Sequence, residues 1–193
     1  MELIAITGGI GSGKSVVASI VKVMGFEVYD CDSRARALMT DNDDVKSQLI
    51  QAFGMETYLD DGSLNRQHLS KVAFGNEQAL ACLNAIVHPA TARDLQHWAS
   101  LQALQGAKAA FVETALLHTA ALDRVVDGVW HVTAPADVRI GRVMARSGLT
   151  SQQVEERMAA QAAEDIVAPG EHVIVNDNLD ALLPQVIRLT NHL

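Results

Sequence analysis

The chain has 193 residues, of which 49% are hydrophobic and 20% charged, and this length and composition suit one compact soluble domain. Its formal net charge of −8 argues against a nucleic-acid-binding surface. No stretch approaches the roughly 18 apolar residues that span a membrane, and the first residues lack the layout of a signal peptide. We therefore expect a cytoplasmic protein, a monomer or weak homo-oligomer with no nucleic-acid or membrane partner, in which Cys31 and Cys82 are free thiols.

An apolar run over residues 2–6 leads into the glycine-rich sequence GGIGSGKS at residues 8–15, which matches G-x-x-x-x-G-K-[ST] in full. Glycines permit the tight turn and let backbone N–H groups converge on phosphate oxygens, where the following helix N-terminus adds positive charge. A purely structural glycine turn is the alternative, which the complete motif and its strand–helix context disfavour. We predict a nucleoside triphosphate site that includes Gly8, Gly9, Gly11, Ser12, Gly13, Lys14, Ser15 and Val16.

The residues and motifs that accompany this loop indicate which class of nucleotide-dependent protein carries it. Lys14 is suited to the β- and γ-phosphates and the Ser15 hydroxyl to Mg²⁺. A GTPase would carry an N-K-x-D motif, but the sequence NDNL at residues 176–179 lacks its lysine. A transport-type ATPase would be much longer and would carry a signature loop that this sequence does not have. The pattern favours a small-molecule kinase that uses ATP and Mg²⁺.

The remaining elements predict a parallel sheet. Apolar spacing indicates a helix over residues 16–24 and a second strand over 26–29, which completes a βαβ unit. The expected fold class is α/β, with a P-loop NTPase-type, five-stranded, mostly parallel sheet and helices on both faces. Further strands are predicted over residues 109–112, 128–133 and 172–175, and further helices over 33–40, 43–53, 66–74, 77–86 and 89–104.

Residues 33–107 hold no convincing strand pattern, and a helical insertion of this size between two sheet strands usually forms a lobe over the site. We treat residues 1–193 as a single domain with a core over 1–32 and 108–193 and an insertion over about 33–107. Pro89 stands where an insertion helix would begin, so His88 is interpreted as structural or as a weak substrate contact.

Asp30 and Asp32 stand at the carboxyl end of the second strand, where parallel open sheets bind their ligands. If the extended conformation continues to Asp32, both carboxylates face the same side. Asp32 could then accept a proton from an attacking hydroxyl, with Asp30 in support. Asp32 could instead be the N-cap of a helix that begins near Ser33. Spacing alone leaves both interpretations open.

Two further sets of polar residues are candidates for the site. Glu113 ends the third strand, where P-loop proteins commonly place an acid that holds Mg²⁺ through water, so Ser15 and Glu113 are the candidate metal residues. Arg139, Arg142 and Arg146 fall on one helix and would neutralise charge on a transferring phosphoryl group, or would simply lie on the surface.

The segment that follows these arginines resembles a closing lid. The sequence TSQQ at residues 150–153 predicts a capping box, and two short helices would meet at Ser147-Gly148. A mobile cover over about residues 138–165 would exclude water, which a kinase needs to avoid hydrolysing ATP.

In their order along the chain, these motifs resemble the dephospho-CoA kinase family over nearly the whole length. The phosphate loop alone is not specific to that family, but the ordered set is. The set comprises ITGGIGSGKS, the pair Asp30 and Asp32, LNAIVHP at residues 83–89, the acid and double leucine from Glu113 to Leu117, the arginine pair Arg142 and Arg146, the pair Arg157 and Gln161, and Asn176-Asp177.

The resemblance implies transfer of the ATP γ-phosphate to the 3′-hydroxyl of dephospho-coenzyme A, which gives coenzyme A and ADP in the last step of coenzyme A synthesis. It also implies that Asp32 is the general base and that Arg142 lies at the phosphates together with Lys14. Asn176 would lie near the ATP adenine, and the helical insertion would hold the acceptor.

The sequence departs from the family after the third strand. The usual proline-leucine-leucine-aromatic-glutamate run reads ALLHT here, so the acidic position is occupied by Thr119. Val16 replaces the usual threonine, although Ser15 keeps the metal hydroxyl. A shikimate kinase is the alternative enzyme, but its glycine triplet after the third strand is missing. A nucleotide-binding switch is the alternative of another class, which the acid after the second strand and the arginines disfavour.

Overall fold

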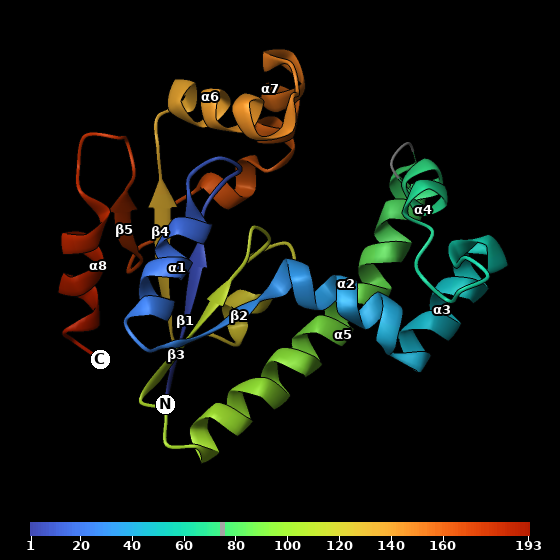
Figure 1. The fold of residues 1–193 in the computed structure, drawn as a ribbon, viewed down its shortest axis with the longest axis horizontal. Helices are drawn as coiled ribbons and strands as arrows, with labels where there is room; N and C mark the ends of the chain where they lie inside the picture. The colour runs from blue at the N-terminus through green and yellow to red at the C-terminus, as the bar shows by residue number, and fades with distance from the viewer. Residues whose placement is uncertain (74–75) are drawn as a thin grey trace. The chain divides into compact units, whose positions relative to one another are not determined.

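The computed structural model describes residues 1–73 and 76–193 and divides the chain into two compact units, Met1–Asp30 with Trp98–Leu193, and Cys31–His97. In the first unit, five parallel strands form one sheet in the order β2-β3-β1-β4-β5 (Figure 1). The predicted α/β class and all five predicted strands are confirmed. The strands are β1 Glu2–Thr7, β2 Glu27–Asp30, β3 Ala109–Glu113, β4 Gly128–Thr133 and β5 His172–Val175.

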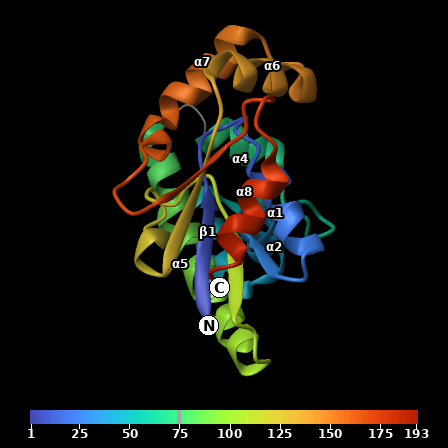
Figure 2. The same ribbon diagram turned by 90° about the vertical axis from the view of Figure 1, so that its left-hand side faces the viewer.

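Helices cover both faces of this sheet. α1 (Lys14–Val23) and α8 (Leu182–Thr190) lie on one side of β1 and share a buried core with it (Figure 2). Val28 of β2 packs against the same core, so Tyr29 must point to the opposite face. There the Tyr29 ring lies 5.4 Å from that of Trp98, near the end of α5 (Glu77–Leu104). Fully burying one large apolar side chain such as Phe111 contributes about 1.5–3 kcal/mol.

The second unit is helical, as the sequence predicts. It contains α2 Cys31–Asp41, α3 Asp43–Phe53, the short helix η1 Met55–Thr57, α4 Arg66–Ala73 and the first part of α5. The chain turns at residues 60–63, where Leu59 N donates to Ser63 O and an isolated antiparallel bridge joins Tyr58 to Leu64. The last residue of the helix predicted over 66–74 lies outside the described residues.

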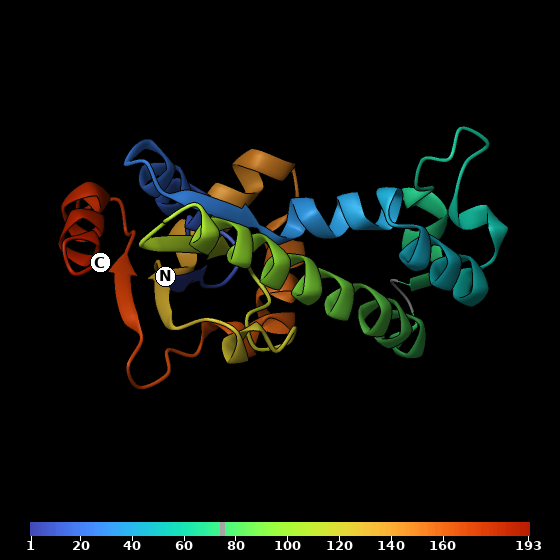
Figure 3. The same ribbon diagram turned by 90° about the horizontal axis from the view of Figure 1, so that it is seen from below.

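The prediction of two helices over 77–86 and 89–104 is wrong. α5 is one helix from Glu77 to Leu104, and Pro89 lies inside it rather than at a helix start (Figure 3). A proline inside a helix removes one backbone hydrogen bond and costs about 3 kcal/mol. Ala90 lies in a buried cluster with Leu49, and this packing offsets the cost. His88 therefore lies inside the helix and does not begin one. It is half-buried, and this burial lowers its pKa.

The chain leaves β2 earlier than the extended reading of Asp32 requires. β2 ends at Asp30 and α2 begins at Cys31, so Asp32 lies in the first helical turn rather than in a strand. The alternative, in which Asp32 is the N-cap of a helix that begins near Ser33, does not match the structure either, because Asp32 lies inside α2 and not before it. An acidic residue in the first turn still interacts favourably with the helix dipole.

The predicted helix pair of the 138–165 segment is present. α6 (Ala136–Ser147) ends at Gly148, and α7 (Ser151–Ala160) begins with the predicted capping box, in which Thr150 Oγ1 accepts from Gln153 N and Gln153 Oε1 accepts from Thr150 N. Two short helices, η2 Leu122–Arg124 and η3 Ala162–Asp165, complete the first unit.

The described residues also bear on membrane insertion and on the two cysteines. None of the helices over residues 1–73 and 76–193 is both long and apolar enough to cross a bilayer. Cys31 is buried and Cys82 is exposed, and among the described residues neither takes part in a disulfide.

Candidate active site

The carboxyl ends of three neighbouring strands bring the loop after β1 close to two acids. β1 lies between β3 and β4, and Ile6 near its end pairs with Glu113 of β3. Glu113 in turn pairs with Asp30, the last residue of β2. Because parallel strands run in the same direction, Asp30 and Glu113 lie side by side at the edge of the sheet from which the phosphate loop emerges. This is the position at which open α/β sheets bind their ligands.

The phosphate loop ends at an uncapped helix N-terminus. Gly13 is the N-cap of α1, and no side chain caps the first N–H groups of this helix. The backbone of Gly13 has φ +98°, and a Cβ there would overlap Asn176 Nδ2, so a larger residue is excluded both by conformation and by space. Unpaired N–H groups at a helix start form an anion site, which suits a phosphate.

Lys14 is folded back onto its own loop. Its Nζ donates to Gly8 O at 2.8 Å and to Gly9 O at 3.2 Å. These contacts place the ammonium group across the mouth of the turn, next to the N-terminus of α1. The positive charge therefore lies at the position where the sequence motif predicts the β- and γ-phosphates.

Side chains on the outer side of the loop bind its carbonyl groups. Ile10 O accepts from Arg139 Nε at 2.8 Å, and Ser12 O accepts from Asn176 Nδ2 at 2.7 Å. Arg142 Nη1 lies 3.4 Å from both Gly11 O and Ser12 O. In a trans peptide the N–H points opposite to the C=O, and the described residues contain no cis bond. The N–H groups of Gly11 and Gly13 therefore point away from these side chains, as a phosphate cradle requires.

Arg142 and Asn176 form one group on this rim. Arg142 Nη2 donates to Asn176 Oδ1 at 3.1 Å and also to Asn178 Oδ1. Asn176 directly follows β5 and is buried, so it is held in place by the sheet. The next residue begins a tight turn, in which N–H groups of Asp180 and Leu179 donate to Asp177 Oδ1 and lower the pKa of Asp177. Both predicted nucleotide residues of this region thus contact the loop itself.

The candidate Mg²⁺ residues fit that ion chemically. Ser15 lies in the first turn of α1 with an exposed side chain, and Glu113 and Asp30 supply carboxylates at the neighbouring strand ends. Mg²⁺ prefers oxygen ligands, and in phosphate sites it takes only one or two from the protein because waters and phosphates supply the rest. The described residues contain no group of three His, Cys, Asp or Glu side chains arranged to hold a metal.

Three residues that sequence reasoning did not assign to the site contact its loops. Gln161 Oε1 accepts from Ile10 N at 3.1 Å, and Asp165 Oδ2 accepts from Arg139 Nη1 at 3.0 Å. Glu164 is 2% exposed and accepts from His118 N, Thr119 N and Thr119 Oγ1, the last at 2.7 Å. The departure from the family at Thr119 was the available signal, because Glu164 binds that residue.

Loss of the Glu164 carboxylate is expected to destabilise the protein. Glu164→Ala removes the acceptor of three hydrogen bonds in a buried position, and we expect the free energy of unfolding to fall by about 2–4 kcal/mol in a urea titration. Glu164→Gln keeps an acceptor oxygen and should cost about half as much. Glu155→Ala is the matched control, because Glu155 is exposed and accepts a hydrogen bond from Ser151; equal losses at the two positions would contradict the expectation.

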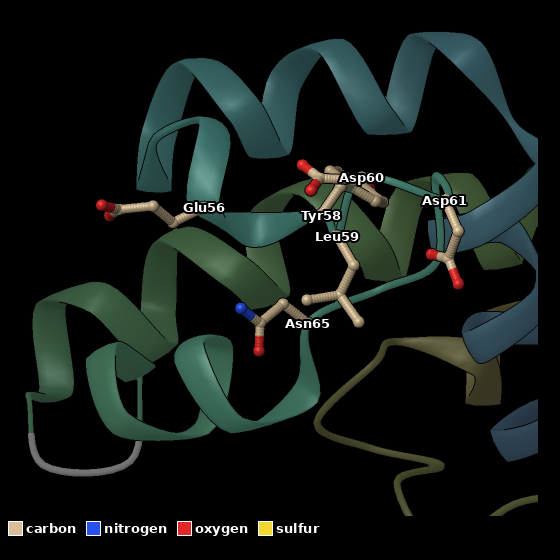
Figure 4. Close-up of a pocket in the computed structure, with 6 residues that line it drawn as sticks. All are labelled: Glu56, Tyr58, Leu59, Asp60, Asp61 and Asn65. Atoms are coloured by element: carbon tan, nitrogen blue, oxygen red, sulfur yellow. The ribbon is translucent and has the colours of Figure 1, made fainter.

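The second unit carries an open hollow of about 460 Å³ that is negatively charged. Figure 4 shows its lining side chains around the turn after η1. A Ser63 hydroxyl and N–H donate to Asp61 and lower the pKa of Asp61, so this carboxylate is ionised at neutral pH. The lining residues that the structure describes include three acids and no basic side chain, a composition that disfavours a phosphorylated ligand. The lining residues are Glu56, Tyr58, Leu59, Asp60, Asp61 and Asn65.

Comparison with known proteins connects this site to one family. The family model for dephospho-CoA kinase matches residues 2–181. A dephospho-CoA kinase of Corynebacterium glutamicum is 36% identical over 178 residues, which cover 92% of this chain and 89% of the relative. The crystal structure of TT1252 from Thermus thermophilus aligns with a TM-score of 0.78 at 30% identity, over 99% of this chain and 95% of that one. Dephospho-CoA kinase from Campylobacter jejuni has the same fold, with a TM-score of 0.74 at 21% identity over 100% and 97% of the two chains.

Proposed function

The chain belongs to the dephospho-CoA kinase family, the enzymes of the final, ATP-dependent step of coenzyme A synthesis, and from this we propose a role for each residue of its site. The observation that carries the proposal is the phosphate loop, whose carbonyls are bound from outside by Arg139, Arg142 and Asn176. A loop held in this way presents its N–H groups to the triphosphate before ATP arrives. Pre-organised donors of this kind are the main source of catalysis in phosphoryl transfer.

Lys14 and Arg142 are the cationic residues of the proposed mechanism. Lys14 exchanges its contacts with Gly8 O and Gly9 O for the β- and γ-phosphate oxygens, since an anionic partner gives a stronger hydrogen bond than a carbonyl. Arg142 lies beside Asn176, so we propose that the two residues bind the nucleotide together, with Arg142 towards the phosphates and Asn176 towards the adenine. The backbone of Gly8, Gly9, Gly11, Ser12 and Gly13, with Ser15 and Val16, completes the ATP site.

Mg²⁺ would be held by Ser15 directly and by Glu113 through water, with Asp30 beside Glu113. When bound, the ion supplies positive charge that offsets charge on the transferred phosphoryl group. Glu113 and Asp30 contribute by fixing the water shell from two paired strand ends.

We propose that Asp32 is the general base. Asp32 follows the last residue of β2 by two positions and lies in the first turn of α2. A carboxylate there would accept the proton of the acceptor's 3′-hydroxyl as that oxygen attacks the γ-phosphorus. Residues of the helical insertion over 33–107 are proposed to hold dephospho-CoA, and the 138–165 segment is proposed to act as the lid. We expect a cytoplasmic monomer or weak homo-oligomer.

The decisive experiment is ADP release from Mg-ATP with and without dephospho-CoA. We expect strong stimulation by dephospho-CoA and conversion of that substrate to coenzyme A. No stimulation in a folded, ATP-binding protein would overturn the assignment. Stimulation by shikimate instead would indicate the alternative kinase, and binding of ATP with no stimulation by either acceptor would indicate a nucleotide-dependent switch.

A further inference from the structure

The two ends of the proposed lid are joined by an ion pair. Arg139 lies in the first turn of α6 and Asp165 ends η3, 26 residues later along the chain. Arg139 Nη1 donates to Asp165 Oδ2 at 3.0 Å, and the two side chains are 9% and 29% exposed. A charged pair with so little contact with water is screened less by solvent than a surface pair.

The lid residues hold the two peptide units on either side of Ile10 in the phosphate loop. Arg139 Nε donates to Ile10 O at 2.8 Å, and Gln161 Oε1 accepts from Ile10 N at 3.1 Å. Both polar groups of Ile10 are thus bound by side chains from the start and the end of the lid. Rotation of the Gly9–Ile10 peptide would break the bond to Gln161, and rotation of the Ile10–Gly11 peptide would break the bond to Arg139.

We propose that Arg139, Asp165 and Gln161 are positioning residues for ATP: they fix the peptide units before and after Ile10, and thereby the direction of the Gly11 N–H and of the N–H groups that follow it in the loop. The base of the lid and the phosphate loop then move as one body. Opening and closing of the lid is confined to the residues between Arg142 and Gln161, the two residues that contact the loop. This inference rests on the proposed nucleotide site and deepens it.

Because the Arg139 guanidinium is buried, single and double substitutions of Arg139 and Asp165 can test whether the two residues act together. Arg139 is 7% exposed, and among the described residues its Nη2 has no hydrogen-bond partner. Asp165 is therefore the charge that compensates this cation. Removing one partner of a buried pair leaves an uncompensated charge and costs more than replacing both partners together.

The test compares Arg139→Gln, Asp165→Asn and the double variant, with Arg188→Gln as control because Arg188 is an exposed arginine of α8. The measurements are the Kd of ATP without acceptor, KM for each substrate, kcat and Tm. We expect Asp165→Asn to raise the Kd of ATP about tenfold, which corresponds to about 1.4 kcal/mol, and the double variant to raise it less. KM for dephospho-CoA at saturating ATP should stay within twofold.

Two results would overturn the proposal. A lower Tm with an ATP Kd within twofold of wild type would show a structural role only. Equal losses in Asp165→Asn and in the double variant would show that the pair is not coupled. If Asp165→Asn does not fold, Gln161→Ala replaces it, since no buried charge is left behind, and Gln161→Glu keeps the acceptor oxygen and should restore ATP affinity. Because ATP binding is measured without acceptor, an error in the acceptor's identity would leave these outcomes unchanged.

Discussion

Asp32→Asn is expected to lower kcat by about 10²- to 10⁴-fold, because the amide cannot take the proton of the attacking hydroxyl. The substitution keeps the size of the side chain, so the Kd of ATP should stay within about twofold of wild type. Steady-state ADP release with saturating dephospho-CoA, together with ATP binding by calorimetry, measures the two quantities separately.

The competing structural role of Asp32 gives a different result. Asp32 lies in the first turn of α2, where a negative charge stabilises the helix by about 0.3–1 kcal/mol. If that were its whole role, Asp32→Asn would lower the free energy of unfolding slightly and leave kcat unchanged. Asp41→Asn at the other end of the same helix is the matched control: Asp41 is exposed, and its substitution should leave kcat unchanged and raise rather than lower the free energy of unfolding, because a negative charge is unfavourable at a helix C-terminus.

Lys14→Met should be the second large loss, in ATP affinity and turnover together. The substitution removes the cation nearest the helix N-terminus while keeping most of the side-chain volume, and removal of one such electrostatic group costs about 10²- to 10³-fold in kcat. The nucleotide-free protein loses the hydrogen bonds from Lys14 Nζ to Gly8 O and Gly9 O, so we expect its free energy of unfolding to fall by about 1–2 kcal/mol.

A thermal-shift measurement separates the loss of ATP binding from the loss of stability. ATP should raise the Tm of wild type and of Lys22→Met, an exposed lysine near the end of the same helix, but not that of Lys14→Met. An ATP-dependent shift in Lys14→Met equal to that of wild type would contradict the role given to the lysine.

Local signals account for what could be predicted. The loop motif, the five strands and the capping box at Thr150 depend on residues a few positions apart, and each is present in the structure. The contacts that complete the site join residues far apart in the chain, such as Ile10 and Gln161, 151 positions apart. No spacing rule reaches that distance, so Gln161, Glu164 and Asp165 were not assigned to the loops that they bind.

The misplaced helix boundary in α5 has a different cause. Proline usually marks a helix start, and the local rule was applied at Pro89. The helix continues because its neighbours are buried, with Leu95 at 0% exposure and Val87 at 7%. Tertiary packing, which sequence spacing does not report, outweighed the local preference.

Gly9, the second glycine of the loop, connects these observations to the variation expected among related sequences. Gly9 is not among the residues with positive φ, so its backbone does not require glycine. Its Cβ would instead overlap Arg139 Nη2 and Asp165 Oδ1, so the space for a side chain at this position is taken by the ion pair. Positions 9, 139 and 165 should therefore covary: a chain with shorter or uncharged residues at 139 and 165 can accept alanine or serine at 9, and a chain with this arginine and aspartate cannot.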